Sequence, residues 1–339
     1  MIRTSFSLIA LLMALIAMPL EGFAQTLKIA TIAPEGSSWM HDMRAGAKAI
    51  ENATEGRVKF KFYGGGVQGN DKQVQRKMRT GQLHGGAFTS GAMNKFQEDA
   101  DMFALPMIFS TIEEARYARA ELEPELRERL EEAGYVNFGF AAAGFAYMMS
   151  NKPLSTLSDL DGQKVWIPEG DPAGFAALRA LGVAPVVMPV TDVMTGLQTD
   201  LLDSVTVPPV GAVVFQWHTR LKYLSNVPVA YVYAALLIDK RAFSRISTED
   251  QQIVRDVMEG IYRKFDQNGV KENAQAMQAL LDNGLEMISA NPTEVEQWQE
   301  IVSKSHRNLA GQGVFDIELL DRMQGLIEDF RNGQAASGQ

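Results

Sequence analysis

Strands and helices alternate in the first ninety residues, and this alternation limits the possible folds more than any other feature. Apolar and polar side chains alternate over residues 27–32, and residues 57–63 form a second strand-like segment. Helical patterns follow at 37–53, with Ser37 or Ser38 as cap, and at 71–81, with Asn70 or Asp71 as cap. Residues 83–89 add a third apolar segment. The β-α-β-α-β order predicts a parallel sheet with helices on its faces.

The rest of the chain predicts a second α/β unit and long helices. A charged helix is expected at 112–134, restarting at Pro124, before apolar strands at 135–142 and 145–150. From residue 163 onward, strands (164–167, 184–188) alternate with helices (172–181, 191–199), and one long strand covers 226–238. Residues 248–281 predict a single helix of about 50 Å. Helices at 293–309 and 316–330 and a disordered tail at 333–339 complete the chain.

The first 24 residues have the pattern of a secretory signal peptide. Arg3 supplies the positive charge, residues 6–18 are apolar, and Gly22 and Ala24 are small residues at the cleavage positions. The alternative, a membrane anchor, needs about 20 apolar residues, more than this run provides. We therefore expect cleavage after Ala24 and export to the periplasm. The remaining chain of about 315 residues is large for one core, which predicts two lobes.

The composition argues against several classes of function. The chain has no cysteine, which excludes disulfides, thiolate metal sites and a cysteine nucleophile. Its four histidines show no metal-binding spacing, and no nucleophile elbow or P-loop is present. A net charge of -9 argues against nucleic acid as a partner. We expect a protein that is not an enzyme and that holds neither a cofactor nor a metal.

One glycine-rich segment imitates a dinucleotide-binding fingerprint. Gly64, Gly66 and Gly69 match G-x-G-x-x-G between a strand and a helix. However, the motif follows the second strand rather than the first, and the position of the acidic ribose partner holds residues 88–91, FTSG. We therefore interpret the glycines as a flexible turn that permits positive φ angles, and not as an NAD site.

Motifs in a fixed order resemble the solute-binding proteins of TRAP (tripartite ATP-independent periplasmic) transporters, of the dicarboxylate-binding type. The resemblance covers residues 27–265. The matching segments are APEGSSW (33–39), YGGGVQG (63–69), RTGQLHGG (79–86), ALPMIF (104–109), SDLDGQKVWIP (158–168), LGVAPVVMP (181–189) and DVMTGLQTDLLDS (192–204).

The resemblance implies a two-lobed periplasmic-binding-protein (venus-flytrap) fold with a long helix that spans both lobes. Lobe one would comprise residues 25–145 and 237–285, and lobe two residues 146–236 and 286–332. A solute bound between the lobes would be delivered to the membrane permease, in some relatives with an accessory helical-repeat protein. The resemblance implies ligand-binding roles for Glu35, Trp39, Gln68, Phe88, Phe145, Ala146, Trp166, Pro168, Val207 and Trp217.

This chain departs from the family pattern at three polar positions. The carboxylate-binding arginine of the family corresponds to Trp166, a second arginine to Ala146, and an asparagine to Val207. We therefore expect an apolar or amphipathic solute, covered by Trp166, whose indole N–H would donate it one hydrogen bond. Lys164 could instead serve as a partner for a carboxylate. The alternatives are an ordinary small organic acid held by substitute polar groups and, in another class, an exported enzyme.

Overall fold

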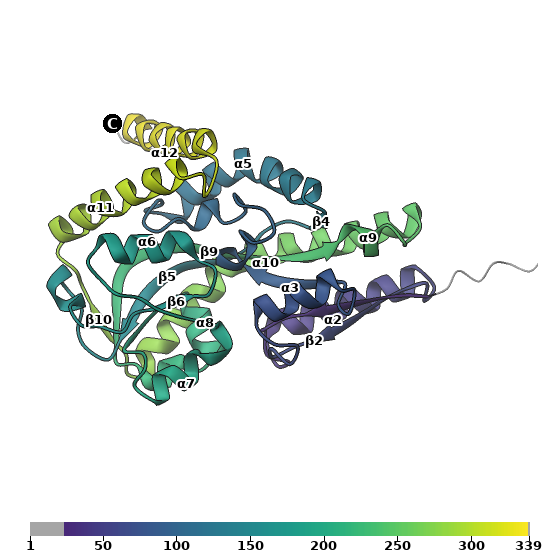
Figure 1. Cartoon of the computed structure of the whole chain (residues 1–339), viewed down its shortest axis with the longest axis horizontal. Helices are drawn as coiled ribbons and strands as arrows, with labels where there is room; N and C mark the ends of the chain where they lie inside the picture. Colours follow the sequence, from purple (N-terminus) through teal and green to yellow (C-terminus); the bar gives the residue numbers. More distant parts are fainter. Residues whose placement is uncertain (1–23, 338–339) are drawn as a thin grey trace, which may run out of the picture.

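The computed structural model describes residues 24–337 (Figure 1). Arg3 and the apolar run of the expected signal peptide lie outside the described residues. Within the described part, no helix is long and apolar enough to cross a membrane. The chain forms two lobes of mixed α/β structure, which confirms the predicted fold class.

A single extended sheet runs through both lobes in the order β2-β1-β3-β9-β5-β8. The first three strands, β1 (Gln25–Ala30), β2 (Val58–Tyr63) and β3 (Gly85–Thr89), are parallel, as the alternation predicts. The long strand β9 (Tyr223–Asp239) is antiparallel to β3 and to β5 (Ala141–Ser150), and β5 is antiparallel to β8 (Ser204–Val207). The short strands β4 (Tyr135–Val136) and β10 (Glu286–Ile288) also pair with β9. Thus β5 and β9 connect the lobes directly.

Lobe one is built around β1, β2 and β3. Helix α2 (Ser38–Ala53) is capped by Ser37 and buries Met40, Met43 and Ile50 against this sheet. The other helical elements are α3 (Asp71–Arg79), α4 (Ser90–Met93), η1 (Met102–Ala104), α5 (Ile112–Glu132) and α9 (Lys240–Phe243). Figure 1 shows α2, α3 and β2 gathered in one half of the molecule, apart from α6, α7 and α8 in the other.

The sequence predicts that helix α5 restarts at Pro124, but the helix continues through this residue without a break. Leu122, Leu126 and Leu130 are four residues apart and all buried, so one apolar face crosses the proline without interruption. Ala120, whose carbonyl loses its helical donor to the proline ring, is exposed to water. Packing of this face therefore outweighs the missing hydrogen bond.

Lobe two contains the small parallel sheet of β6 (Trp166–Pro168) and β7 (Val186–Met188), joined to β8 by the bridge between Val165 and Ser204. Its helical elements are η2 (Leu157–Leu160), α6 (Pro172–Ala180), η3 (Val190–Asp192), α7 (Val193–Gln198), α8 (Pro209–Val214) and η4 (Trp217–Arg220). Its main core includes Val193, Leu202 and Trp217. The lobe thus has a hydrophobic core of its own.

Helix α10 (Thr248–Asp282) is the predicted long helix, with 35 residues. Val254, Met258 and Tyr262 join the core of lobe one, whereas Leu280 joins that of lobe two. At mid-helix a Cβ on Gly269 would lie 2.1 Å from the carbonyl oxygen of Ala142, so only glycine lets the helix backbone approach β5 this closely. The helix therefore spans both lobes.

The last two helices pack on different lobes. Helix α11 (Pro292–Gly311) lies on α6, whereas α12 (Ile317–Ser337) lies along α5 of lobe one, although the expected boundaries assign residues 286–332 to lobe two (Figure 1). Leu320, Met323 and Ile327 anchor α12 in the core shared with α5. The helix continues to Ser337, so residues 333–337 are helical where a disordered tail is expected.

Candidate functional site

A cavity of about 270 Å³ lies where both lobes and the two connecting strands meet. Lobe one contributes Ile32, which lies just after β1, and Thr89, the last residue of β3. Lobe two contributes Pro168 and Val207, the last residues of β6 and β8. The carboxyl ends of strands from both lobes therefore point at one space, the usual position of ligands in open α/β sheets. The connecting strands add Ala143, Ala146 and Met148 from β5 and Ser225, Val227, Val229, Ala230 and Val232 from β9.

The cavity wall is mainly apolar and contains no cation. Among the described residues that line it, none is lysine, arginine or histidine, and Asp171 is the one ionisable side chain. Hydroxyl groups come from Thr89, Ser90, Thr156, Thr206 and Ser225, and an indole N–H comes from Trp298. Lys164, the expected alternative partner for a carboxylate, is exposed and donates through Nζ to the carbonyl oxygen of Asp200 at 2.7 Å. It does not line the cavity.

Trp166 forms part of the wall and is 4% exposed. Its ring packs edge to face on Trp217, with 5.2 Å between centroids, and Phe215 stacks on the other tryptophan. Its Nε1 donates to the carbonyl oxygen of Met188 at 3.0 Å, because the parallel pairing of β6 and β7 brings these residues together. The indole N–H is therefore already used, and the expectation that it donates a hydrogen bond to the solute is wrong.

The structure brings five of the ten sequence-predicted site residues to the cavity. They come from β5, β6, β8 and η4: Ala146, Trp166, Pro168, Val207 and Trp217.

The other five predicted residues do not line the cavity. Glu35 pairs with Arg44 at 2.6 Å, Trp39 stacks on Phe265, and the Gln68 side chain accepts a hydrogen bond from Lys77. Phe88 and Phe145 are buried in the core of lobe one, against Phe96 and Tyr231 respectively. All five have partners within the protein.

The cavity also contains residues that the sequence interpretation did not identify. Asp171 precedes Pro172 and caps helix α6, where its Oδ1 accepts from the N–H of Gly174 at 2.7 Å. An Asp-Pro pair at a helix start is visible in the sequence, but it predicts a cap and not a position in a wall. Trp298 and Val302 of α11 are more than 60 residues from the other wall residues, and no local pattern marks them.

A second carboxyl group, Asp101, lies beside this end of the cavity and is 5% exposed. Asn94 donates from Nδ2 both to Asp101, at 3.0 Å, and to the carbonyl oxygen of Gly170 in lobe two, at 2.8 Å. Burial, together with the nearby charge of Asp171, raises the pKa of Asp101 to about 8, and burial also raises the pKa of Asp171. We call this contact region, Asn94 and Asp101 against Gly170 and Asp171, the acidic seam between the lobes.

Comparison with known proteins assigns the chain to a family. The family described as "Bacterial extracellular solute-binding protein, family 7" matches residues 29–312. The chain belongs to this family. The expected family of TRAP-type solute-binding proteins is thereby confirmed.

Relatives of this family 7 protein are similar over most of the chain at low identity. The C4-dicarboxylate-binding periplasmic protein DctP of Rhodobacter capsulatus is 25% identical over 273 residues, 77% of this chain and 79% of that relative. The match to the uncharacterised protein YiiZ of Salmonella typhimurium, at 24% identity, spans 60% of this chain and 63% of that relative.

Solved structures share the fold of this solute-binding protein. A TRAP periplasmic solute-binding protein of Sulfurospirillum deleyianum with bound succinate has a TM-score of 0.81 at 17% identity, covering 90% of this chain and 99% of that one. The sugar-acid-binding protein of Advenella mimigardefordensis in complex with galactonate has a TM-score of 0.83 at 17% identity, covering 91% and 99%.

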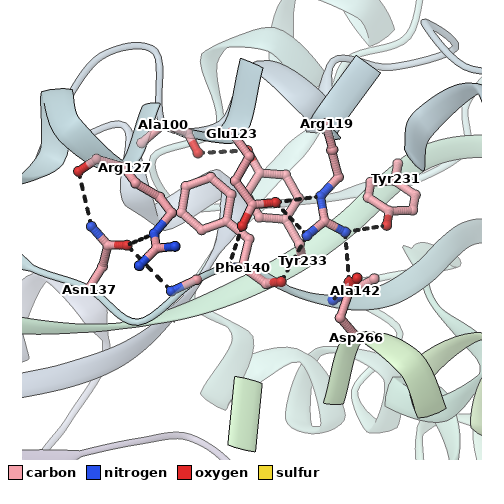
Figure 2. A network of polar contacts seen from close by, with 11 residues as sticks. Ala100, Arg119, Glu123, Arg127, Asn137, Phe140, Ala142, Tyr231, Tyr233 and Asp266 are labelled. Carbon is pink, nitrogen blue, oxygen red and sulfur yellow. Dashed lines mark hydrogen bonds and ion pairs between the residues drawn. The ribbon is translucent and has the colours of Figure 1, made fainter. Parts of the chain in front are cut away.

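The buried arginine of this solute-binding protein, Arg119, is not available to a solute. Figure 2 shows it surrounded by four acceptors: Glu123 and Asp266 at 2.7 Å, and the Tyr231 hydroxyl and the Phe140 carbonyl oxygen at 2.8 Å. These partners raise the pKa of Arg119 despite its burial. The guanidinium connects α5, β9 and α10 and does not line the cavity, so it does not substitute for a carboxylate-binding residue.

The glycine run forms a turn in contact with lobe two. Gly65 and Gly66 have φ angles of 62° and 71°, and their N–H groups donate to the carbonyl oxygens of Ala33 and Thr31. Asn70 caps helix α3 in a capping box with Gln73. The backbone donors that a pyrophosphate would need are thus engaged within the chain. A Cβ on Gly66 would lie 3.0 Å from Thr191 Cγ2, so this turn touches the opposite lobe.

Proposed function

We propose that this protein captures an apolar or amphipathic organic solute in the cavity between its lobes and delivers it to the membrane subunits of a TRAP transporter. The observation that carries the proposal is the cavity wall, which is apolar and free of cations among the described residues. An unpaired carboxylate buried in such a site is expensive, whereas each buried methylene stabilises the complex by about 0.8 kcal/mol. An apolar cavity of 150 Å³ can already hold benzene, so the space here suits a larger apolar group.

Three substitutions relative to the family pattern support this choice of solute. By the resemblance, Trp166, Ala146 and Val207 stand where the family uses two arginines and an asparagine. All three line the same cavity. The relatives with bound succinate and galactonate hold acids, and the proposal is that this chain exchanged their polar anchors for apolar area.

In this proposal the solute contacts the five predicted residues on the wall, Ala146, Trp166, Pro168, Val207 and Trp217. Glu35, Trp39, Gln68, Phe88 and Phe145 do not touch it. Residues 1–24 direct export, the permease is the partner, and an accessory helical-repeat protein is a further candidate partner. The lobe boundaries proposed from the sequence need one revision, because α12 packs on lobe one.

The test is calorimetric titration with a series of straight-chain amphiphiles of increasing length. Affinity should rise by up to about 0.8 kcal/mol per methylene until the cavity is full. Trp166→Ala should remove about 2–3 kcal/mol of binding, because most of the indole face is lost. Trp39→Ala is the matched control, since this tryptophan stacks on Phe265 outside the cavity and should leave the affinity unchanged.

The main alternative is a small organic acid held by the wall hydroxyls. Micromolar binding of succinate or malate by the unaltered protein, with no gain from longer tails, would establish that alternative and refute an apolar solute.

A further inference from the structure

A residue with an unusual backbone conformation borders the cavity. Among the described residues, four that are not glycine have positive φ angles: Glu55, Met107, Asp200 and Gln216. Three of them directly follow the C-cap residue of a helix, where a left-handed residue is common. Met107 does not, because it lies inside the segment 104–109, ALPMIF. It is also the one of the four that lines the cavity.

The turn that contains Met107 is of a kind that normally takes glycine. Residues 105–108 form a turn closed by a hydrogen bond from the N–H of Ile108 to the carbonyl oxygen of Leu105, at 3.3 Å. Pro106 is its second residue, and Met107, with a φ angle of 57°, is its third. Proline followed by a positive φ angle is the pattern of a type II turn, whose third position favours glycine because a Cβ there crowds the backbone. Methionine therefore makes this turn less stable than glycine would.

The surrounding structure holds Met107 in this conformation. Its N–H donates to the carbonyl oxygen of Val229 at 2.6 Å. Val229 lies where the register of β9 against β5 shifts, and it lines the cavity as Met107 does. On either side of the turn, Leu105 and Phe109 are buried in the core of lobe one. Such over-determined, strained residues cluster at ligand sites, so the position of Met107 at the cavity points to a role in binding.

We propose that Met107 is a specificity-determining residue, whose side chain is an adaptable part of the wall and limits the length of the apolar body that the cavity accepts. Glycine would suit the turn better, so what methionine adds at this position is its side chain. Met107 is only partly buried, and its unbranched thioether chain can adjust to solutes of different shape. This inference rests on the proposed function, because it assumes that the solute occupies the cavity. It goes further by naming a residue that selects the size of the solute.

The experiment titrates straight-chain primary alcohols of increasing length into the mature protein and into Met107→Ala and Met107→Gly. Both variants should bind the short alcohols about tenfold more weakly, because a contact is lost. Both should also raise the chain length at which affinity stops increasing by about three methylene groups, the space that the methionine side chain leaves. An unchanged length limit would overturn this inference and leave the apolar solute intact. No gain from longer chains in the unaltered protein would overturn both.

Thermal unfolding of the same two variants tests the strain separately from the side chain. Alanine keeps a Cβ at the positive φ angle, whereas glycine releases the strain, so Met107→Gly should unfold at a higher temperature than Met107→Ala. Glu55→Gly is the matched control, because Glu55 has a φ angle of 49°, is exposed and lies outside the cavity, and its length limit should equal that of the unaltered protein. A lower unfolding temperature for Met107→Gly than for Met107→Ala would show that the turn is not strained and would contradict the argument for the side chain.

Discussion

At the scale of single residues, the acidic seam places two carboxyl groups where the lobes meet. Asp101 is buried and accepts a side-chain hydrogen bond from Asn94, while Asp171 adds repulsion from the other lobe. Burying the ionised form is costly, so the proton stays on Asp101 to unusually high pH. Protonation of this group is therefore linked to the stability of the folded protein.

The sign of the linkage gives a prediction for Asp101→Asn. The pKa of Asp101 is about 8 in the folded protein and about 4 when unfolded, so its favourable contribution is complete below pH 4 and is lost as the pH rises to 8. The asparagine cannot ionise, but its oxygen still accepts from Asn94. The difference in melting temperature, variant minus unaltered protein, should therefore increase between pH 4 and pH 8. A difference between the two that stays constant over this range would contradict it.

Single residues also show where prediction from sequence ends. The resemblance placed Trp166 in the cleft, but its hydrogen bond depends on the register of β6 against β7, which no local pattern encodes. Trp298 was missed because its position follows from the packing of α11 on α6, a contact between distant segments. Phe88 and Phe145 are strand residues whose side chains point to the core face instead of the cavity, a distinction that a one-residue change in register reverses.

At the scale of elements, the turn between β2 and α3 contacts the opposite lobe at Gly66. Gly66 touches Thr191 of η3, whereas a Cβ on the neighbouring Gly65 would meet nothing within 4 Å. Both glycines have positive φ angles, so replacing either by alanine introduces similar backbone strain. Comparing Gly65→Ala with Gly66→Ala therefore distinguishes the effect of backbone strain within the turn from the effect of a steric contact between the lobes.

We predict that Gly66→Ala weakens solute binding by roughly 1 kcal/mol, or about fivefold, relative to Gly65→Ala. The new methyl group would press on Thr191 Cγ2 at 3.0 Å only when the lobes are closed. Adding Thr191→Ser removes that methyl, keeps the hydroxyl bonded to Asp192, and should restore most of the affinity. Titration of the four proteins with one amphiphile measures this, and equal affinities for the two alanine variants would rule the contact out.

Most elements were predictable because their apolar periodicity is strong. The alternation over residues 27–89 gives the three parallel strands, and the caps Ser37 and Asn70 begin the helices where expected. The continuation of α5 through Pro124 was not predictable from the local rule, because the buried leucine face decides it. The last helix was predicted to end near Phe330, and no local pattern marks its continuation to Ser337.

At the scale of the whole molecule, the Arg119 network joins the parts of the chain that cross between lobes. The guanidinium links α5 to β9 and α10, and Asp266 of α10 also accepts from the N–H of Ala142 at the start of β5 (Figure 2). Removing the cation leaves Glu123 and Asp266 without their main partner in a mostly buried site. The network therefore supports the region on which both lobes depend.

We predict that Arg119→Met lowers the free energy of unfolding by about 3–5 kcal/mol, the usual effect of breaking a buried ion pair by removing one partner. Arg116→Met is the matched control, because this arginine lies on the exposed side of the same helix and its loss should change stability by less than about 0.5 kcal/mol. Urea denaturation followed by circular dichroism measures both. Similar midpoints for the two variants would show that the network contributes little.

The close approach of Gly269 to Ala142 has a mechanical consequence. With no side chain between them, the backbones of α10 and β5 pack directly on each other at this point. The pairing of β5 with β9 becomes irregular just beyond it, where the register shifts around Gly144 and Tyr147. Ala143 and Ala146, which adjoin these shifts, also line the cavity. A solute held in the cavity, as proposed, would therefore contact the irregular part of β5, and its size would act directly on a strand that connects the two lobes.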